Sequence, residues 1–197
     1  MATKPHPEQC ETEGRVCVFF DRDGVVNRAP DPERYVTRFE AFQLLPAFWQ
    51  ALSAVREAGA VAVVVTNQRG LATGLVASSE LERMHQHLVE SAAERGLEIL
   101  DILVCPFDDD QHPWRKPQPG MLLEAARRHH LDLARSWMVG DQESDVLAGR
   151  QAGCRTVRLL RCEEPSEADV VIRDEANLAE TLRQCLAEGA VKGAPNE

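Results

Sequence analysis

The sequence lacks any hydrophobic run long enough to cross a membrane, since its longest apolar stretches, such as residues 61–65, are far too short. It also lacks a recognisable signal or transit peptide, because residues 1–15 carry charges of both signs and no apolar segment. We therefore expect no membrane association and a cytoplasmic location.

Cysteine and basic residues are both used sparingly. The 6 cysteines form no Cys-X-X-Cys pair, which favours reduced, mostly buried thiols over a disulfide framework. The 22 Lys and Arg residues are outnumbered by 32 Asp and Glu residues, which gives a formal net charge of −10. Affinity for a nucleic-acid backbone comes from clustered Lys and Arg, so nucleic acid is disfavoured as a partner.

What the sequence does have is a globular composition, with 44% hydrophobic and 27% charged residues in a chain of 197. At about 150 residues per domain, this length predicts one domain with one hydrophobic core. We expect the domain to occupy residues 14–188, with a flexible segment before it at residues 1–13 and a flexible tail after it at residues 189–197.

Apolar runs alternate with segments of helical spacing along the domain. The first run, residues 16–20, is continuously apolar and stops at Asp21, as expected for a strand buried on both faces. This alternation predicts an α/β fold with a doubly wound, Rossmann-like parallel sheet flanked by helices. Further strands are expected at residues 61–65, 100–105, 137–139, 156–160 and 169–172, and helices at 46–58, 79–95, 120–129, 144–152 and 177–187.

Polar side chains gather just after three of the expected strands, where ligands bind in an open α/β sheet. Several carboxylates at one edge repel one another unless a positive group joins them, and the candidates are a bound cation and Lys116. The pattern therefore indicates a magnesium site. The polar side chains at this edge are Asp21, Asp23, Thr66, Asn67, Asp141 and Asp145, of which the four aspartates are the candidates to hold the metal.

Asp21 and Asp23 are two residues apart, so both can project to the same side where the strand ends. One can act as a nucleophile while the other transfers protons. A carboxylate needs no deprotonation at neutral pH, and it can attack a phosphoryl group whose charge is neutralised by a metal and a lysine. The pair thus indicates phosphoryl-transfer chemistry.

Four segments resemble the signature motifs of the haloacid dehalogenase (HAD) phosphatases and occur in the same order: FFDRDGVVN, VVVTNQ, WRKP and MVGDQESD. The resemblance implies a HAD-like fold and a phosphomonoester hydrolase that forms an aspartyl-phosphate intermediate. It makes Asp21 the nucleophile and Asp23 the general acid and base. It also implies that Thr66 bonds the transferring phosphoryl group, with Asn67 beside it, and that Lys116 neutralises that group.

The same resemblance implies a Mg²⁺ cofactor held by the Asp21 carboxylate, the Asp23 backbone carbonyl and Asp141. Asp145 then holds either the water shell of the metal or Lys116. The connections between the motifs are too short to contain a cap domain. The chain is therefore similar to the capless group of the superfamily, subfamily IIIA.

Within the capless group, the chain most resembles the D-glycero-D-manno-heptose 1,7-bisphosphate phosphatases, on the segments DRDG, TNQRGLATG, RKP and GML. The resemblance implies a small phosphorylated metabolite as substrate and partner, above all a sugar bisphosphate. Asn67, Gln68 and Arg115 are then substrate contacts. Arg28 and Arg34 are candidate contacts to a second phosphate, although both are equally well explained as solvated loop charges.

Two departures from this family stand out. Where its members carry a zinc loop, this chain reads CPFDDDQHPW, with the thiolate of Cys105 and the imidazole of His112. Two such ligands cannot make a closed tetrahedral site, so no structural zinc is expected. Position 142 is Gln where the heptose enzymes often show Lys.

Three alternative functions stay open. Histidinol-phosphate phosphatases share the same motifs. Polynucleotide 3′-phosphatases share the TNQ-type second motif, although the net charge of −10 disfavours them. A HAD-fold binding module without activity is the third alternative. Whichever function the chain has, a monomer or a weak homodimer is expected.

Overall fold

The structure is a computed structural model that describes residues 14–30 and 35–191 of the 197-residue chain. The predicted flexible segment at residues 1–13 lies outside the described residues, as does the part of the predicted tail at residues 192–197. Within the described ranges, no helix has the length and apolar character that a membrane span needs.

Six parallel strands form the central sheet, in the order β3-β2-β1-β4-β5-β6. The chain moves outward from β1 to β3, then returns to place β4 beside β1 and moves outward again to β6, which confirms the predicted doubly wound, Rossmann-like fold. Ligands bind such sheets where the winding reverses, here between β1 and β4. The strands are β1 (Cys17–Phe20), β2 (Val61–Asn67), β3 (Asp101–Cys105), β4 (Trp137–Gly140), β5 (Arg155–Leu159) and β6 (Val170–Ile172).

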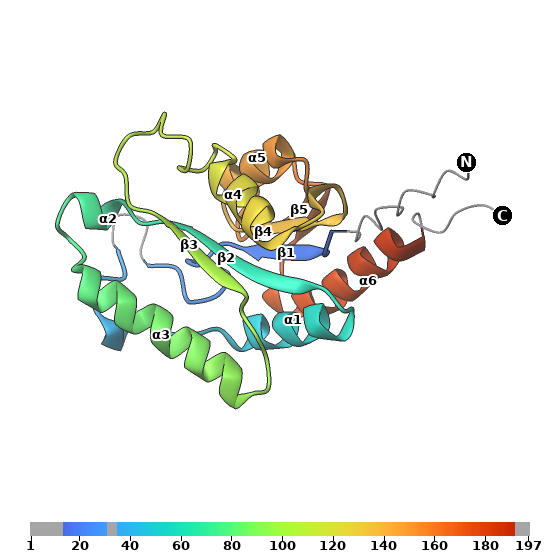
Figure 1. The fold of residues 1–197 in the computed structure, drawn as a ribbon, viewed down its shortest axis with the longest axis horizontal. Helices are drawn as coiled ribbons and strands as arrows, with labels where there is room; N and C mark the ends of the chain where they lie inside the picture. Colours follow the sequence, from blue (N-terminus) through green and yellow to red (C-terminus); the bar gives the residue numbers. More distant parts are fainter. Residues whose placement is uncertain (1–13, 31–34, 192–197) are drawn as a thin grey trace, which may run out of the picture.

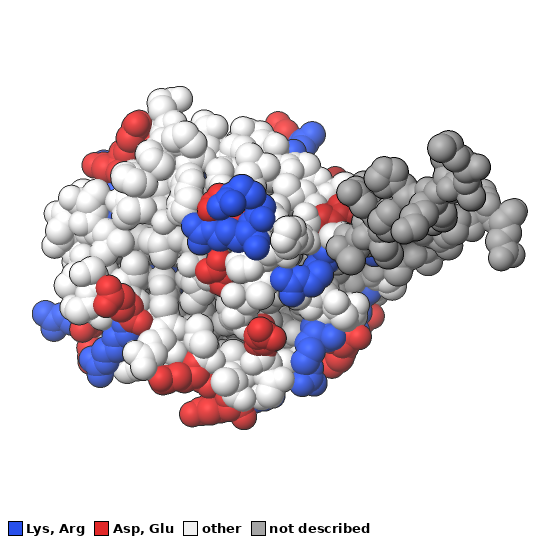
Figure 2. All heavy atoms as spheres, in the orientation of Figure 1, with Lys and Arg blue, Asp and Glu red and all other residues white. Residues whose placement is uncertain are grey.

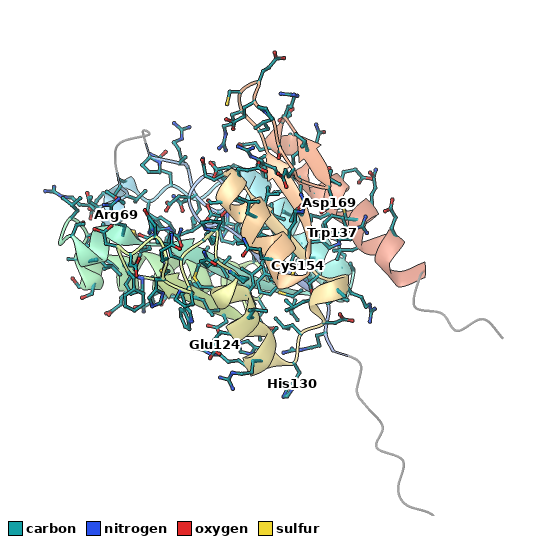
Figure 3. All side chains as sticks on the ribbon, turned by 90° about the horizontal axis from the view of Figure 1, so that it is seen from above. Arg69, Glu124, His130, Trp137, Cys154 and Asp169 are labelled. Atoms are coloured by element: carbon teal, nitrogen blue, oxygen red, sulfur yellow. The ribbon has the colours of Figure 1, made fainter. Side chains whose placement is uncertain are left out.

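Helices cover both faces of this sheet (Figure 1). On one face lie α1 (Pro46–Glu57), α3 (Ser78–Glu94) and α6 (Leu178–Val191); on the other lie α4 (Gly120–His129) and α5 (Glu143–Ala152). The short α2 (Arg69–Ala72) follows β2. Seen from above, Arg69 of α2 and Asp169, which precedes β6, lie toward opposite sides of the molecule, as the strand order requires (Figure 3). Single 3₁₀ turns occur at Phe39–Ala41, Leu133–Arg135 and Glu175–Asn177.

Strand β1 is buried on both faces, as its continuous apolar sequence predicts. Val18 and Phe20 pack into the core shared with α1, where the Phe20 ring meets Phe48 edge to face with 5.4 Å between centroids. Cys17 and Phe19 point the other way, into the core shared with α4 and α5. Full burial of each large apolar side chain contributes roughly 1.5–3 kcal/mol, so the strand that precedes Asp21 is fixed from both sides.

The predicted strands and long helices are all present, and most boundaries differ by one or two residues. The largest difference concerns the end of α6, which continues to Val191, whereas the sequence placed the helix end near Ala187. Leu182 and Leu186 of this helix are buried in the core shared with α1. A glycine costs a helix about 1 kcal/mol relative to alanine, which the packing of the preceding turns outweighs.

Candidate active site

The carboxyl ends of β1, β2 and β4 open into a cleft of about 510 Å³. Asp21 follows β1, Thr66 and Asn67 end β2, and Asp141 follows β4. Lys116 reaches the same cleft from the loop between β3 and α4. The loops that follow β1 and β3 contain at most one short 3₁₀ turn among the described residues. In the part of the chain that the structure describes, no inserted cap domain therefore covers this cleft.

The Lys116 ammonium lies between two carboxylates. Its Nζ forms a close ion pair with Asp21 Oδ1, lies 2.7 Å from Asp145 Oδ1 and donates to the Val65 carbonyl at 3.1 Å. The Lys116 side chain is only 2% exposed. Burial by itself lowers the pKa of Lys116, but the charges of Asp145 and Asp21 outweigh burial and raise this pKa above its ordinary value. The amine therefore stays protonated.

Asp21 sits in surroundings that oppose its negative charge. Burial raises the pKa of its carboxyl well above the ordinary value, Lys116 lowers that pKa, and three neighbouring carboxylates raise it further. The cleft thus holds more negative charge than Lys116 alone compensates. A further positive group is needed to keep Asp21 ionised.

Three carboxylates of the cleft are arranged as metal ligands would be. Asp21, Asp141 and Asp145 each offer an oxygen within 4.8 Å of the others. Hard oxygen donors suit Mg²⁺, which is usually bound through one or two carboxylates, waters and substrate phosphate. Asp145 is already engaged, because Oδ1 pairs with Lys116 and Oδ2 accepts the Gln142 N–H at 3.1 Å. Asp21 and Asp141 are therefore the carboxylates available to a cation.

A glycine allows the loop after β1 to approach the Asp141 carboxylate closely. Gly24, directly after Asp23, has φ +94°, and a Cβ at this position would lie 2.1 Å from Asp141 Oδ2. A side chain here would therefore be strained and would displace the Asp141 carboxylate. Burial and then the Asp145 charge raise the pKa of Asp141 to about 6, which shows how closely these acidic groups are gathered.

The Asp23 carboxylate is fixed by donors from three residues. Arg22 forms a forked pair with it, since Nη2 lies 3.0 and 2.9 Å from the two oxygens and Nε lies 3.3 Å from Oδ1. Asn27 Nδ2 donates to Oδ1 at 2.9 Å, and Gln68 Nε2 donates to Oδ2 at 3.2 Å. The donors from Arg22, Asn27 and Gln68 hold Asp23 in one orientation.

His85 lies near Arg22 and Asp23. Burial, and then the Arg22 charge, lower the pKa of His85 to about 4, so His85 is neutral.

Asn67 and Gln68 act on other residues of the site. Asn67 Nδ2 donates to the Lys116 carbonyl at 3.0 Å, and Asn67 Oδ1 accepts the Lys116 N–H at 3.1 Å. Gln68 is 2% exposed and donates to Thr66 Oγ1 at 2.8 Å as well as to Asp23. Both were predicted as substrate contacts, and the structure uses both amides to position site residues.

Curated proteins of known activity resemble the chain over most of its length. The chain is 37% identical over 144 residues to D-glycero-beta-D-manno-heptose-1,7-bisphosphate 7-phosphatase of Pseudomonas aeruginosa, covering 73% of this chain and 80% of that protein. It is 38% identical over 138 residues to the protein of the same name from Bordetella bronchiseptica, covering 70% and 76%. A HAD-hydrolase-like family model also matches residues 113–184. The chain belongs to this family of HAD phosphatases.

Solved structures agree with the fold of this HAD phosphatase. The D,D-heptose 1,7-bisphosphate phosphatase of B. bronchiseptica, in complex with magnesium and phosphate, has a TM-score of 0.75 at 35% identity and covers 86% of this chain and 98% of its own. The corresponding phosphatase of Burkholderia thailandensis has a TM-score of 0.61 at 28% identity and covers 85% and 97%. The predicted HAD-like fold is confirmed, and the chain is a phosphoric monoester hydrolase.

Two predicted substrate contacts of the phosphatase lie outside the cleft wall of the described structure. Arg115 Nε pairs with Asp110 Oδ1 at 2.8 Å, and its Nη1 donates to the Phe107 carbonyl at 3.3 Å. Arg28 is exposed, and its backbone N–H donates to the Gln43 carbonyl at 2.8 Å.

Sequence reasoning missed three arginines of the phosphatase site: Arg22, Arg158 and Arg161. Arg22 is 1% exposed and Arg158 is 3% exposed, and Arg158 Nε donates to the Asp141 carbonyl at 3.3 Å. An arginine among apolar strand residues needs a polar partner, and that signal was available at Arg158 in β5, whereas Arg22 stands between two aspartates after β1 has ended. Arg161 follows the carboxyl end of β5, but a strand predicted to end at residue 160 left it unremarked.

Proposed function

We propose that this phosphatase hydrolyses a sugar bisphosphate, and that the phosphoryl group passes to Asp21 before water releases it. The observation that carries the proposal is the placement of Asp21, Asp23, Thr66 and Lys116 around one open cleft. D-glycero-D-manno-heptose 1,7-bisphosphate is the substrate we expect, because the relatives are named for it. A cytoplasmic location and a monomeric or weakly dimeric state belong to the same proposal and rest on the sequence alone.

In the first step, the Asp21 carboxylate attacks phosphorus, and the bond between phosphorus and the sugar oxygen breaks while Asp23 donates a proton to that oxygen. No hydrogen bond from the described residues reaches Asp21 Oδ2, so this oxygen is available for attack. In the second step, Asp23 accepts a proton from the water that attacks the phosphoryl group. Inorganic phosphate leaves and the Asp21 carboxylate is restored. Lys116 reduces the repulsion between Asp21 and the phosphoryl oxygens in both steps.

The cofactor we propose is Mg²⁺, held by the carboxylates of Asp21 and Asp141 and by the Asp23 carbonyl. A bound Mg²⁺ neutralises charge on the phosphoryl oxygens. Two findings support this choice: the hard oxygen donors within 4.8 Å of one another, and the magnesium and phosphate bound by the B. bronchiseptica relative. The excess of negative charge around Asp21 also favours a cation here.

Treatment with a chelator is expected to abolish turnover, and added Mg²⁺ is expected to restore it, because hard-oxygen sites exchange their metal without unfolding the chain. The purified enzyme should contain no stoichiometric zinc. Elemental analysis and phosphate release before and after chelation test both statements.

The loop that replaces the zinc loop of the relatives has other contacts to organise it. His112 Nδ1 accepts the Trp114 N–H at 3.2 Å, and the His112 ring stacks on Phe107 with 3.8 Å between centroids. Arg115 adds its ion pair with Asp110. About one zinc per chain, lost in Cys105→Ser, would contradict the zinc prediction.

The substrate class is tested by comparing kcat/KM for heptose 1,7-bisphosphate, histidinol phosphate and a 3′-phosphorylated oligonucleotide. We expect the bisphosphate to be preferred by at least about tenfold, a difference of 1.4 kcal/mol in transition-state binding. Basic and acidic side chains are interspersed on the face shown in Figure 2, without a continuous basic band there, which disfavours the oligonucleotide. Preference for either of the other two substrates would overturn the proposed class and select the corresponding alternative.

A further inference from the structure

The cleft wall contains two cations among the described residues, Lys116 and Arg161. Lys116 is buried, and its charge is shared between Asp21 and Asp145. The Arg161 side chain is 47% exposed. Arg161 is therefore the cation of the wall that a ligand entering from solvent meets first.

Arg161 is held in place while donors remain free. Its Nη2 donates to the Gly24 carbonyl at 2.8 Å and to Glu175 Oε2 at 3.3 Å, and its Nη1 donates to Asp141 Oδ2 at 3.3 Å. A guanidinium has five N–H donors. The Nε–H and one Nη1 hydrogen thus have no partner among the described residues. The head group is oriented by the protein and can still donate to an anionic ligand.

Other carboxylates of the wall have cations of their own. Asp23 pairs with Arg22, which is 1% exposed, and Glu164 pairs with Arg158, which is 3% exposed. Their charges are compensated on the protein side of the wall. Arg161 is therefore not required to neutralise Asp23 or Glu164; its own ion pairs are with Asp141 and Glu175, at 3.3 Å each.

Arg28, which the sequence suggested for a second phosphate, lies outside the cleft wall, and Arg34 lies outside the described residues. Arg115, the predicted substrate contact, is tied to Asp110. Position 142 lines the cleft but is an uncharged Gln. A bisphosphate carries one phosphate to the nucleophile, and its other phosphate still needs a counter-charge within the cleft.

We propose that Arg161 binds the phosphate group of the substrate that is not transferred to Asp21, and that this contact makes the enzyme prefer bisphosphates to monophosphates. The inference rests on the proposed function, since it assigns the second phosphate of that substrate. Arginine suits this role because its planar, permanently charged head group matches phosphate geometry.

The test compares Arg161→Gln with the parent enzyme and with Arg115→Gln as the matched control. Each protein is assayed on heptose 1,7-bisphosphate and on heptose 7-phosphate, which lacks only the second phosphate. Loss of a charge-assisted contact should lower kcat/KM for the bisphosphate roughly ten- to a hundredfold, mainly through KM. The loss on the monophosphate should be at least about tenfold smaller. Arg115→Gln should reduce both activities by similar, smaller factors, and Arg161→Lys should recover part of the selectivity.

Other outcomes overturn the assignment in different ways. Equal losses on the two substrates in Arg161→Gln, or a selectivity loss in Arg115→Gln instead, remove the role from Arg161 while the parent remains a bisphosphatase. A raised Mg²⁺ requirement in Arg161→Gln that accounts for the whole loss means that this residue acts through Asp141. A parent enzyme without preference for the bisphosphate overturns the proposed function itself, and the inference with it.

Discussion

Asp21→Asn is expected to lower kcat by roughly five to six orders of magnitude, the size of loss that follows removal of an enzyme nucleophile. The melting temperature should stay the same or rise. Burial raises the pKa of Asp21, so the folded protein holds this proton more tightly than the unfolded chain does, and ionised Asp21 reduces stability at neutral pH. An amide removes that cost while Lys116 keeps its contact with Asp145. Steady-state turnover and thermal unfolding at neutral pH measure the two effects.

Asp23→Asn is the matched control, because it makes the same chemical change two residues along the chain. Its kcat should fall by only about two to four orders of magnitude, the usual share of general acid–base catalysis. Rapid acid quenching with labelled substrate should recover phosphorylated protein from Asp23→Asn and none from Asp21→Asn. Near-parental activity of Asp21→Asn would refute the covalent mechanism.

Lys116→Met is expected to abolish turnover and to lower the free energy of unfolding by about 3–5 kcal/mol, the cost of leaving buried charge unpaired. Asp145 is 1% exposed and Asp21 is 7% exposed, so solvent cannot replace the missing ammonium. Without it, the pKa of Asp21 loses the Lys116 charge that lowers it, so this carboxyl should titrate further above the unfolded value of about 3.9. The stability deficit is then fully present at neutral pH and shrinks as the pH falls toward that value. Urea denaturation at neutral and mildly acidic pH, with chelator present, measures the deficit.

The double variant Lys116→Met/Asp145→Asn separates the structural role of Lys116 from its catalytic role. It removes one of the two unpaired carboxylates, while the amide oxygen can still accept the Gln142 N–H bond. Part of the lost stability should return, and none of the turnover. If Lys116→Met alone unfolds at the same urea concentration as the parent at neutral pH, Lys116 is not needed to compensate these carboxylates.

The sequence by itself determined the fold class and the edge of the sheet that carries the site. Strand β1 could be predicted because a continuous apolar run that stops at Asp21 is a local property of the chain. Asp21, Thr66 and Asp141 each follow or end such a run, and parallel strands bring their carboxyl ends to one edge. The end of α6 was predicted too early because packing of its buried residues, such as Leu182 and Leu186, stabilises a helix that continues to Val191.

Which groups pair with which was decided only by the tertiary structure. Lys116 is 95 residues from Asp21 in the sequence, and its second partner, Asp145, was left open between the metal's water shell and this lysine. Arg115 pairs with Asp110, and among the described residues Arg161 is the exposed cation of the cleft wall. A hydrogen bond forms only where strand ends and loops bring two side chains within a few ångströms of each other. Which strand ends come together follows from the order of the strands in the sheet, and no local sequence periodicity encodes that order.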